Sequence, residues 1–242
     1  MAGHSVWKNI KHRKAAVDAK RGKIWSKCSR AVIVAARLGG ADPKFNSSLR
    51  IAIDSAKAAN MPRDTIEKAV KKGAGSDAAD QYEAVRYEGY GPGGVAVIVD
   101  CLVANVNKTA PEMRIMFDKN GGNLGVQGSV TYSFSHKGVV LVSADATTEE
   151  KLFDVVLSAG AEDVLSGEEG WQVTCGVADL AKVRDALDAA GIAVESANFS
   201  YIPVSMVELD AVTAARVAKL VAVLEEHDDV QTVHVNAEIP DA

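Results

Sequence analysis

The chain has 242 residues, 48% of them hydrophobic and 24% charged, proportions that are ordinary for a folded globular protein and exclude a chain that is disordered throughout. This length is enough for two or three small domains with buried cores. The formal net charge is −5, which taken alone argues against a partner as acidic as nucleic acid.

The charge is, however, distributed very unevenly along the sequence. Residues 1–72 contain 17 lysines and arginines against 5 aspartates and glutamates, whereas residues 73–242 contain 10 against 27. The net charge is therefore +12 in the first segment and −17 in the second. A segment with such an excess of cations is typical of a surface that binds a polyanion.

The cysteines and the apolar runs restrict the compartment. Cys28, Cys101 and Cys175 lie far apart and form no CxxC pair, which argues against a disulfide framework and a zinc ribbon. The apolar run 31–36 is too short to span a bilayer, and charges from Lys8 to Lys27 interrupt any signal peptide. We expect a cytoplasmic protein that crosses no membrane; a basic start of this kind also fits a mitochondrial transit peptide.

The first third of the chain is predicted to be helical behind an N-terminal arm. Residues 1–21 have neither a helical nor a strand period, so we expect a partly flexible arm that orders on binding. Apolar residues then recur at helical spacing, and Gly39-Gly40, Pro62 and Gly73 supply helix ends and starts. The sequence therefore predicts a three-helix bundle, with helices over residues 22–38, from 46 or 47 to about 60, and 62–72. The turn-rich segment 73–80 is interpreted as a linker.

Residues 82–136 predict a mixed α/β region. Strands are expected over 82–88 and 95–102, joined by the glycine-rich turn 89–94. A helix is expected to open with the capping box Thr109-x-x-Glu112 and to end at Gly121-Gly122. Alternating apolar residues predict a half-buried strand over 130–135.

Residues 138–203 repeat a known order of elements, βαββαβ, which is the ferredoxin-like split βαβ unit. The expected helices are one capped by Thr147-x-x-Glu150 and one closed by Gly191. The expected strands cover residues 139–143, 162–165, 171–175 and 193–199.

The remaining residues predict a strand over 205–209, a helix around 217–224 and a strand over 230–235. Neither this tail nor residues 82–136 has enough strands for a complete sheet, so we expect the two to combine. The expected fold class is α+β, an N-terminal three-helix bundle plus two ferredoxin-like α/β domains, one inserted in the other. The expected domains are 1–79, a discontinuous middle domain of 80–136 and 204–242, and an inserted domain of 137–203.

The arm and the bundle contain the predicted nucleic-acid-binding residues. A row of cations displaces counterions from phosphates, and each contact contributes to affinity. Trp7 is a candidate for base stacking, whereas Trp25 is better explained as bundle core. The short turn at residues 60–62 also permits a helix-turn-helix, although most three-helix bundles read no DNA. The predicted set is Lys8, Asn9, Lys11, His12, Arg13, Lys14, Lys20, Arg21, Lys23, Lys27, Arg30, Arg63, Lys68, Lys71 and Lys72.

Two glycine-rich loops are candidates for a further functional role. Gly89-x-Gly91-x-x-Gly94 has the letters of a dinucleotide fingerprint, but a strand rather than a helix is expected to follow it. We interpret it as a tight turn that exposes Tyr90. The second loop, 121–125, lacks the Lys-Ser/Thr of a phosphate-binding P-loop. The candidate loop residues are Tyr90, Gly91, Pro92, Gly93, Gly121, Gly122 and Asn123.

Catalytic and metal-binding patterns are absent from the sequence or generic. Acidic pairs such as Asp228-Asp229 are interpreted as solvated turn residues. We therefore predict no enzyme activity, no cofactor and no metal; a metal nuclease built from scattered carboxylates is the alternative.

Several blocks of the sequence resemble one family. They are MAGHSVWKNIKHRKAAVDAKRGK at the start, VAARLGGADP (34–43), AANMP (58–62), YEGYGPGGVAVIVDCL (87–102) and GGNLG with GSV (121–130). These blocks are similar to the YebC/PmpR family, and the resemblance covers essentially the whole chain, thinning after about residue 145. It implies the same three-domain fold. Family members are named probable transcriptional regulators that bind DNA, and eukaryotic relatives include a mitochondrial translational activator.

Two positions depart from the family pattern. Val6 stands where relatives usually carry lysine, which removes one cation from the arm. Lys108 stands where arginine is frequent, which keeps the charge but loses the planar guanidinium needed for bidentate recognition.

Two functional hypotheses follow from the residues and the resemblance. The first is a DNA-binding transcriptional regulator whose acidic domains contact protein partners. The second is a ribosome-associated translation factor whose basic arm lies on ribosomal RNA, with the loops at Tyr90 and Gly122 probing a functional centre. An irregular basic arm favours folded RNA, and family naming favours DNA.

Overall fold

The computed structural model describes residues 21–75, 81–167 and 170–239. The predicted arm and most of the predicted linker lie outside these residues. The described chain divides into two compact units, one of residues 135–202 and one of residues up to 134 together with those from 203 onward. Within the described residues, no helix is both long enough and apolar enough to cross a membrane.

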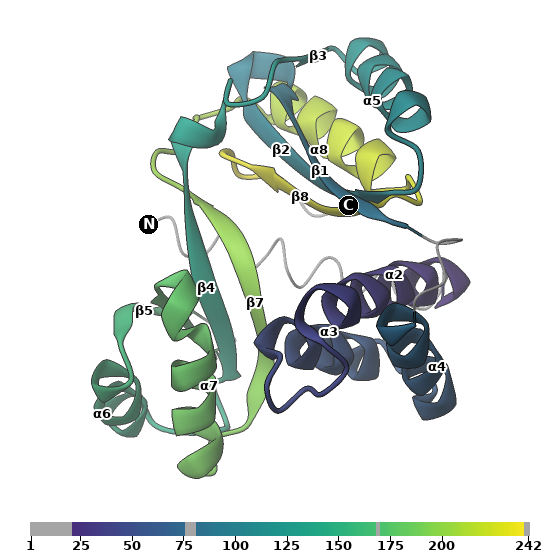
Figure 1. Cartoon of the computed structure of the whole chain (residues 1–242). Coiled ribbons are helices and arrows are strands. Elements are labelled where there is room, and N and C mark those ends of the chain that lie inside the picture. The colour runs from purple at the N-terminus through teal and green to yellow at the C-terminus, as the bar shows by residue number, and fades with distance from the viewer. Residues whose placement is uncertain (1–20, 76–80, 168–169, 240–242) are drawn as a thin grey trace. The chain divides into compact units, whose positions relative to one another are not determined.

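The N-terminal helices of the described chain form a bundle with a small core (Figure 1). Val32 of the first helix packs against Leu49 and Ile66 of the next two. The first and third helices approach closely at Gly73, where a Cβ atom would lie 2.4 Å from the Ile33 carbonyl oxygen. The helices are α2 (Arg21–Gly39), α3 (Ser47–Ala58) and α4 (Arg63–Ala74).

Trp25 belongs to this core. Its ring packs against the bundle, and its Nε1–H donates to the Ala59 carbonyl oxygen at 3.0 Å. A half-buried indole with a satisfied N–H stabilises the bundle, which agrees with the prediction of a core role over base stacking.

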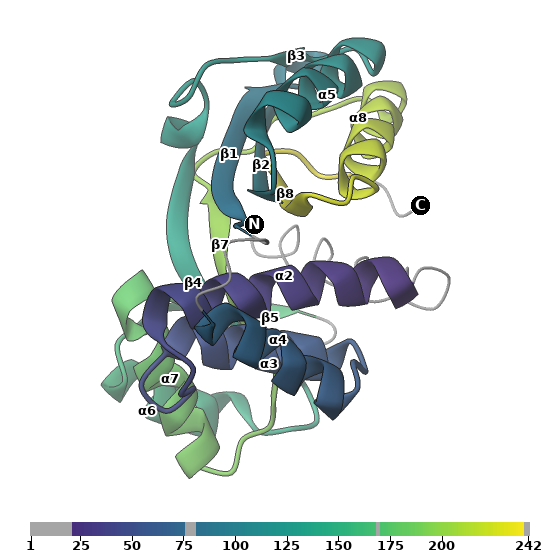
Figure 2. The ribbon, with the colours of Figure 1, turned by 45° about the vertical axis from the view of Figure 1, so that its right-hand side comes forward.

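The middle sheet combines strands from both ends of the second unit. Its order is β3-β1-β2-β8, and each neighbouring pair is antiparallel. Two helices cover the same face of this sheet (Figure 2). Their side chains Phe117 and Leu220 fill the core together with Val97 and Val99. The elements are β1 (Glu83–Tyr90), β2 (Ala96–Val103), α5 (Val106–Lys119), β3 (Asn123–Leu124), α8 (Ala211–Glu225) and β8 (Val230–Val235).

The other unit has the strand order β5-β6-β4-β7, the order expected of a βαββαβ fold. Leu152, Val156, Val183 and Leu187 are buried on its two helices. The elements are β4 (Phe134–Ser143), α6 (Glu149–Ser158), β5 (Ala161–Gly167), β6 (Gly170–Cys175), α7 (Leu180–Ala189) and β7 (Val194–Pro203). The predicted α+β fold class is therefore confirmed. The domain limits stay a prediction, which these strand orders favour.

Two predicted strands are wrong. Residues 131–133 form a 3-10 turn, and the strand begins only at Phe134, because the Glu88 carboxylate accepts the backbone N–H groups of Val130 and Thr131. Residues 205–209 form no strand but a single parallel bridge, between Val207 and Ala237.

Two predicted helix starts are also wrong. The N-cap of α5 is Asn105, whose side chain accepts the Asn107 N–H, so Thr109 lies inside the helix. Its hydroxyl donates to Asp229 Oδ2 and does not cap the helix. The N-cap of α6 is Thr148, one residue beyond the predicted Thr147.

Asn46 joins two helices of the bundle. Its Oδ1 accepts the Leu49 N–H and caps α3, while its Nδ2 donates to the carbonyl oxygens of Ala35 and Gly40 at the end of α2, both at 2.8 Å. Because the side chain is 6% exposed, no water replaces these bonds readily.

We expect Asn46→Ala to lower the free energy of unfolding by about 2–3 kcal/mol, through the loss of a cap and of the two hydrogen bonds from Nδ2 to the end of α2. The measurement is urea unfolding followed by circular dichroism. Asn105→Ala is the matched control, because it removes an exposed cap alone and should cost about 0.5–1 kcal/mol. Equal losses for the two variants would contradict a linking role for Asn46.

Candidate nucleic-acid interface

More than half of the predicted nucleic-acid-binding set lies outside the described residues or is described without its side chain. Arg21 begins α2, but only its backbone is described. The residues outside the description are Trp7, Lys8, Asn9, Lys11, His12, Arg13, Lys14 and Lys20.

The predicted cations of α4 are all exposed. Arg63 forms an ion pair with Glu67 one turn further on, at 2.8 Å, and Asp64 lies in the first turn. Lys71 and Lys72 lie in the last turn, where the helix dipole favours cations. The N-terminal half of α4 therefore has mixed charge, and its C-terminal half is basic.

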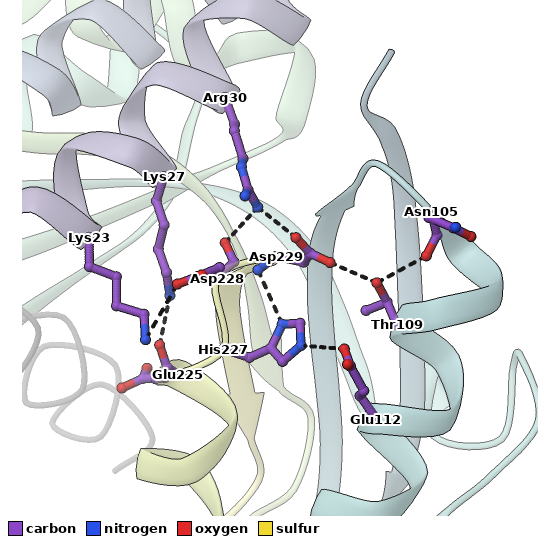
Figure 3. A network of polar contacts seen from close by, with 10 residues as sticks. All are labelled: Lys23, Lys27, Arg30, Asn105, Thr109, Glu112, Glu225, His227, Asp228 and Asp229. Atoms are coloured by element: carbon purple, nitrogen blue, oxygen red, sulfur yellow. Dashed lines mark hydrogen bonds and ion pairs between the residues drawn. The ribbon is translucent and has the colours of Figure 1, made fainter. Parts of the chain in front are cut away.

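The predicted cations of α2 lie on one face of the helix, because positions 23, 27 and 30 are four and three residues apart. This α2 cation face (Lys23, Lys27 and Arg30) contacts the acidic turn (Glu225–Asp229) that joins α8 to β8, as Figure 3 shows. Lys23 Nζ lies 3.4 Å from Asp228 Oδ1, and Lys27 Nζ donates to the Glu225 carbonyl oxygen at 2.7 Å.

Arg30 makes the most enclosed contact of this face. Its Nη1 donates to the Asp228 carbonyl oxygen at 2.8 Å and to Asp229 Oδ1 at 2.7 Å. The side chains of Arg30 and Asp229 are only 17% and 18% exposed. The guanidinium also lies over the Tyr82 ring, 5.1 Å from its centroid. Charge-assisted bonds at this burial are less screened by water than surface ion pairs.

The acidic turn is held by the middle sheet and its helices. Thr109 Oγ1 donates to Asp229 Oδ2 at 2.7 Å, and the Asp229 N–H donates to His227 Nδ1 at 3.1 Å (Figure 3). Because Nδ1 accepts, the imidazole proton lies on Nε2, which is 3.0 Å from Glu112 Oε2 and donates to it. Asp229 is therefore oriented independently of α2.

The interpretation of Asp228-Asp229 as solvated turn residues is wrong for Asp229, which is enclosed and has cationic and hydroxyl partners. The partners lie about 200 residues apart in the sequence, at positions 30 and 229. The one sequence feature that could have predicted this contact is complementary charge. Residues 225–229 are the densest acidic segment of the tail, and the first half of α2 is basic.

The two predicted functional loops lie side by side. Tyr90 pairs with Asn123 across β1 and β3, and a Cβ atom on Gly122 would lie 2.5 Å from the Tyr90 carbonyl oxygen. Glycine is therefore required at position 122 by the close approach of two backbones. Pro92 is buried and Gly93 has φ of +73°, as a tight turn requires.

Tyr90 is half-buried rather than exposed, and its hydroxyl donates to the Ser129 carbonyl oxygen at 3.0 Å. A neighbouring phenol, Tyr132, is 74% exposed, with its oxygen 3.4 Å from that of Tyr90. Arg216 of α8 also lies here, since a Cβ atom on Gly121 would be 3.0 Å from its Nη2. Sequence reasoning missed Arg216, because nothing in the local pattern places α8 beside these loops, and it missed Tyr132, because the pattern of residues 130–135 predicts a strand.

A buried carboxylate fixes the loop that carries Tyr132. Glu88 is 2% exposed and accepts the N–H groups of Gly128, Val130 and Thr131, each at 2.9 Å. Burial favours the neutral acid, but these hydrogen bonds outweigh it, so the pKa of Glu88 lies below its ordinary value. The charged form therefore stabilises the loop.

The described residues show no reactive thiol of low pKa and no metal site. Burial, with smaller contributions from nearby carboxylates, raises the pKa of Cys101 to about 12 and that of Cys175 to about 11. Within residues 21–75, 81–167 and 170–239, no group of three His, Cys, Asp or Glu side chains could hold a metal ion.

The fold and the candidate site define a class of protein in which a basic bundle of helices is followed by two α/β domains, each built on a four-stranded antiparallel sheet. Comparison with known sequences identifies the family. Residues 5–76 match the TACO1/YebC protein N-terminal domain, and residues 82–237 match the TACO1/YebC second and third domain. The chain belongs to the TACO1/YebC family.

Several relatives are similar over the whole chain. A probable transcriptional regulatory protein of Shewanella oneidensis is 52% identical, covering 100% of this chain and 97% of the relative. One from Rubrobacter xylanophilus is 51% identical, covering 99% and 96%. The probable transcriptional regulatory protein YebC of Salmonella typhimurium is 49% identical, covering 100% and 98%. The crystal structure of a conserved hypothetical protein from Aquifex aeolicus has a TM-score of 0.88 at 48% identity, covering 98% of both chains.

Glu88→Gln should lower the free energy of unfolding at pH 7 by about 1–3 kcal/mol, because an amide cannot accept all three N–H groups. Since the folded pKa is depressed, the contribution of Glu88 is complete above the ordinary carboxyl pKa of about 4.3 and is lost as the pH falls through the lower folded value. Urea unfolding from pH 7 to pH 3 should therefore show the two proteins converging. The exposed Glu83→Gln is the control, with a change under about 0.5 kcal/mol. A difference that stays constant with pH would refute the role of the charged form.

Proposed function

We propose that this protein is a nucleic-acid-binding regulator of gene expression, a DNA-binding transcriptional regulator whose basic N-terminal domain holds the phosphate backbone. The observation that carries the proposal is the division of charge, +12 over residues 1–72 against −17 over the rest. A polyanion is attracted to the first segment and repelled by the second, so it docks in one orientation.

The charges on α4 favour contact with the backbone over base readout. A recognition helix contacts base edges through its N-terminal residues. Here that end carries Asp64, and Arg63 is paired with Glu67, so two carboxylates would face the phosphates. The exposed cations of the C-terminal half, Lys68, Lys71 and Lys72, suit phosphates of any sequence.

The names of the relatives support a regulatory role, since all those described above except the Aquifex protein are named probable transcriptional regulatory proteins. The three free thiols support a reducing compartment, which we take to be the bacterial cytoplasm. The acidic segments, with net charges of −8 over 137–203 and −6 over 204–242, are proposed to contact protein partners.

A second candidate function is translation, with the basic domain on ribosomal RNA. The lack of a purely basic reading face on α4 favours it, because backbone contact serves folded RNA as well as duplex DNA. The loops at Tyr90 and Gly122, with Arg216 and the exposed Tyr132 beside them, would contact the same RNA.

Replacing Lys11, Arg13 and Lys14 together with glutamine should weaken binding to all DNA sequences alike and reduce the slope of log K against log[salt] by roughly two to three units. Fluorescence anisotropy with two unrelated labelled duplexes, at several salt concentrations, measures both quantities. The matched control replaces Lys137, Lys151 and Lys182 with glutamine, which removes the same charge from the acidic segment of the sequence. This variant should leave the slope unchanged. Equal losses for the two triple variants would overturn the proposal, and a loss on one duplex only would indicate base readout.

Sedimentation separates the two candidate functions. If the protein acts in translation, it should co-migrate with ribosomes in a sucrose gradient of cell lysate at low salt and leave them at high salt. If it acts in transcription, it should stay at the top of the gradient and protect a defined promoter segment from nuclease.

A further inference from the structure

We propose that the acidic turn (Glu225–Asp229) is an intramolecular substitute for nucleic-acid phosphates, which covers the α2 cation face (Lys23, Lys27 and Arg30) until a polyanion displaces it. This inference rests on the proposed function, because it assigns the α2 cation face to the nucleic-acid interface. The inference goes further in that a segment of the same chain, the acidic turn, competes with nucleic acid for this face.

The atoms that meet α2 are two carboxylate oxygens, of Asp228 and Asp229, and two backbone carbonyl oxygens, of Glu225 and Asp228. Each of the three cations contacts an oxygen, and Arg30 Nη1 contacts two at once. Positions 23 to 30 span about 10 Å along the helix. A phosphate backbone would offer anionic oxygens to the same nitrogens, so the turn and the nucleic acid cannot occupy the face together.

The acidic turn can separate from α2 without a change in its own conformation. Asp229 is oriented by Thr109 and His227, which belong to the same half of the contact, so the turn keeps its shape when α2 leaves. The Arg30–Asp229 pair is more enclosed than the Lys23–Asp228 pair, whose side chains are 34% and 68% exposed. Exposed pairs of this kind contribute little and are screened by salt, so a polyanion with several phosphates displaces them.

Because the turn must be displaced first, the α2 cation face binds only ligands that carry enough negative charges. A ligand with one or two negative charges does not replace all of the oxygens that the turn supplies, whereas a nucleic acid does. The α2 cation face is therefore available to polyanions and closed to small anions.

The test uses the full chain and a fluorescein-labelled 25-base-pair duplex of arbitrary sequence. Asp228→Asn should raise affinity about two- to fivefold at about 0.1 M salt, the factor that one exposed ion pair represents. Asp118→Asn is the matched control. This exposed carboxylate on α5 lies about 13 Å along the helix from Thr109, the residue of α5 that contacts the acidic turn. That distance exceeds the electrostatic screening length of about 10 Å at 0.1 M salt. The control variant should change affinity by less than about 1.5-fold. Equal gains for both variants would overturn the proposal.

A double-mutant cycle separates release of Lys23 from simple repulsion by Asp228. Lys23→Gln should weaken binding more in the Asp228→Asn background than in the wild type, because only there is Lys23 free of its protein partner. Additive effects would overturn the competition while leaving the proposed function intact. If Lys23→Gln and the arm variant both leave affinity unchanged, the proposed function itself fails.

Discussion

The attraction between a basic first third and an acidic remainder is the interaction on which this molecule depends. A chain with +12 on one segment and −17 on the other must either let the two meet or give each a different partner. In the structure the two segments meet at α2. Lys23 and Arg30 of α2 meet carboxylates of the acidic turn and Lys27 meets a backbone carbonyl there, while the cations at the end of α4 are exposed. The proposed binding to the phosphate backbone rests on this placement of charge and needs no dedicated reading element.

Most elements of the fold could be predicted from the sequence, because apolar periodicity and glycine stops are local signals. The two failed strands have a common cause. At residues 130–131 the N–H groups are taken by Glu88, more than 40 residues away, and at Val207 a single bridge to Ala237 replaces a ladder. A tertiary partner overrode a local preference in each case. The displaced helix start at Asn105 differs, since a capping-box pattern at Thr109 concealed a threonine whose hydroxyl bonds to Asp229.

The candidate site was predictable only as a set of cations, not as a surface. Composition identifies which residues attract phosphates, but it does not show which of them the protein already occupies. Lys23, Lys27 and Arg30 have partners near position 228, which no local pattern reveals. The loops at Tyr90 and Gly122 were recognised by their glycines. Their neighbour Arg216 was not, because its position depends on the packing of α8 against the sheet, and Tyr132 was not, because its loop is fixed by Glu88.

The pairing of β2 with β8 has a consequence for the newly made chain. The ribosome synthesises β2 some 130 residues before β8, so the edge of β2 that β8 will cover lacks its partner during most of elongation. The carboxylates that cover α2 are made at the same late stage. In a nascent chain, Lys23, Lys27 and Arg30 therefore lack these contacts until the segment between α8 and β8 has been made.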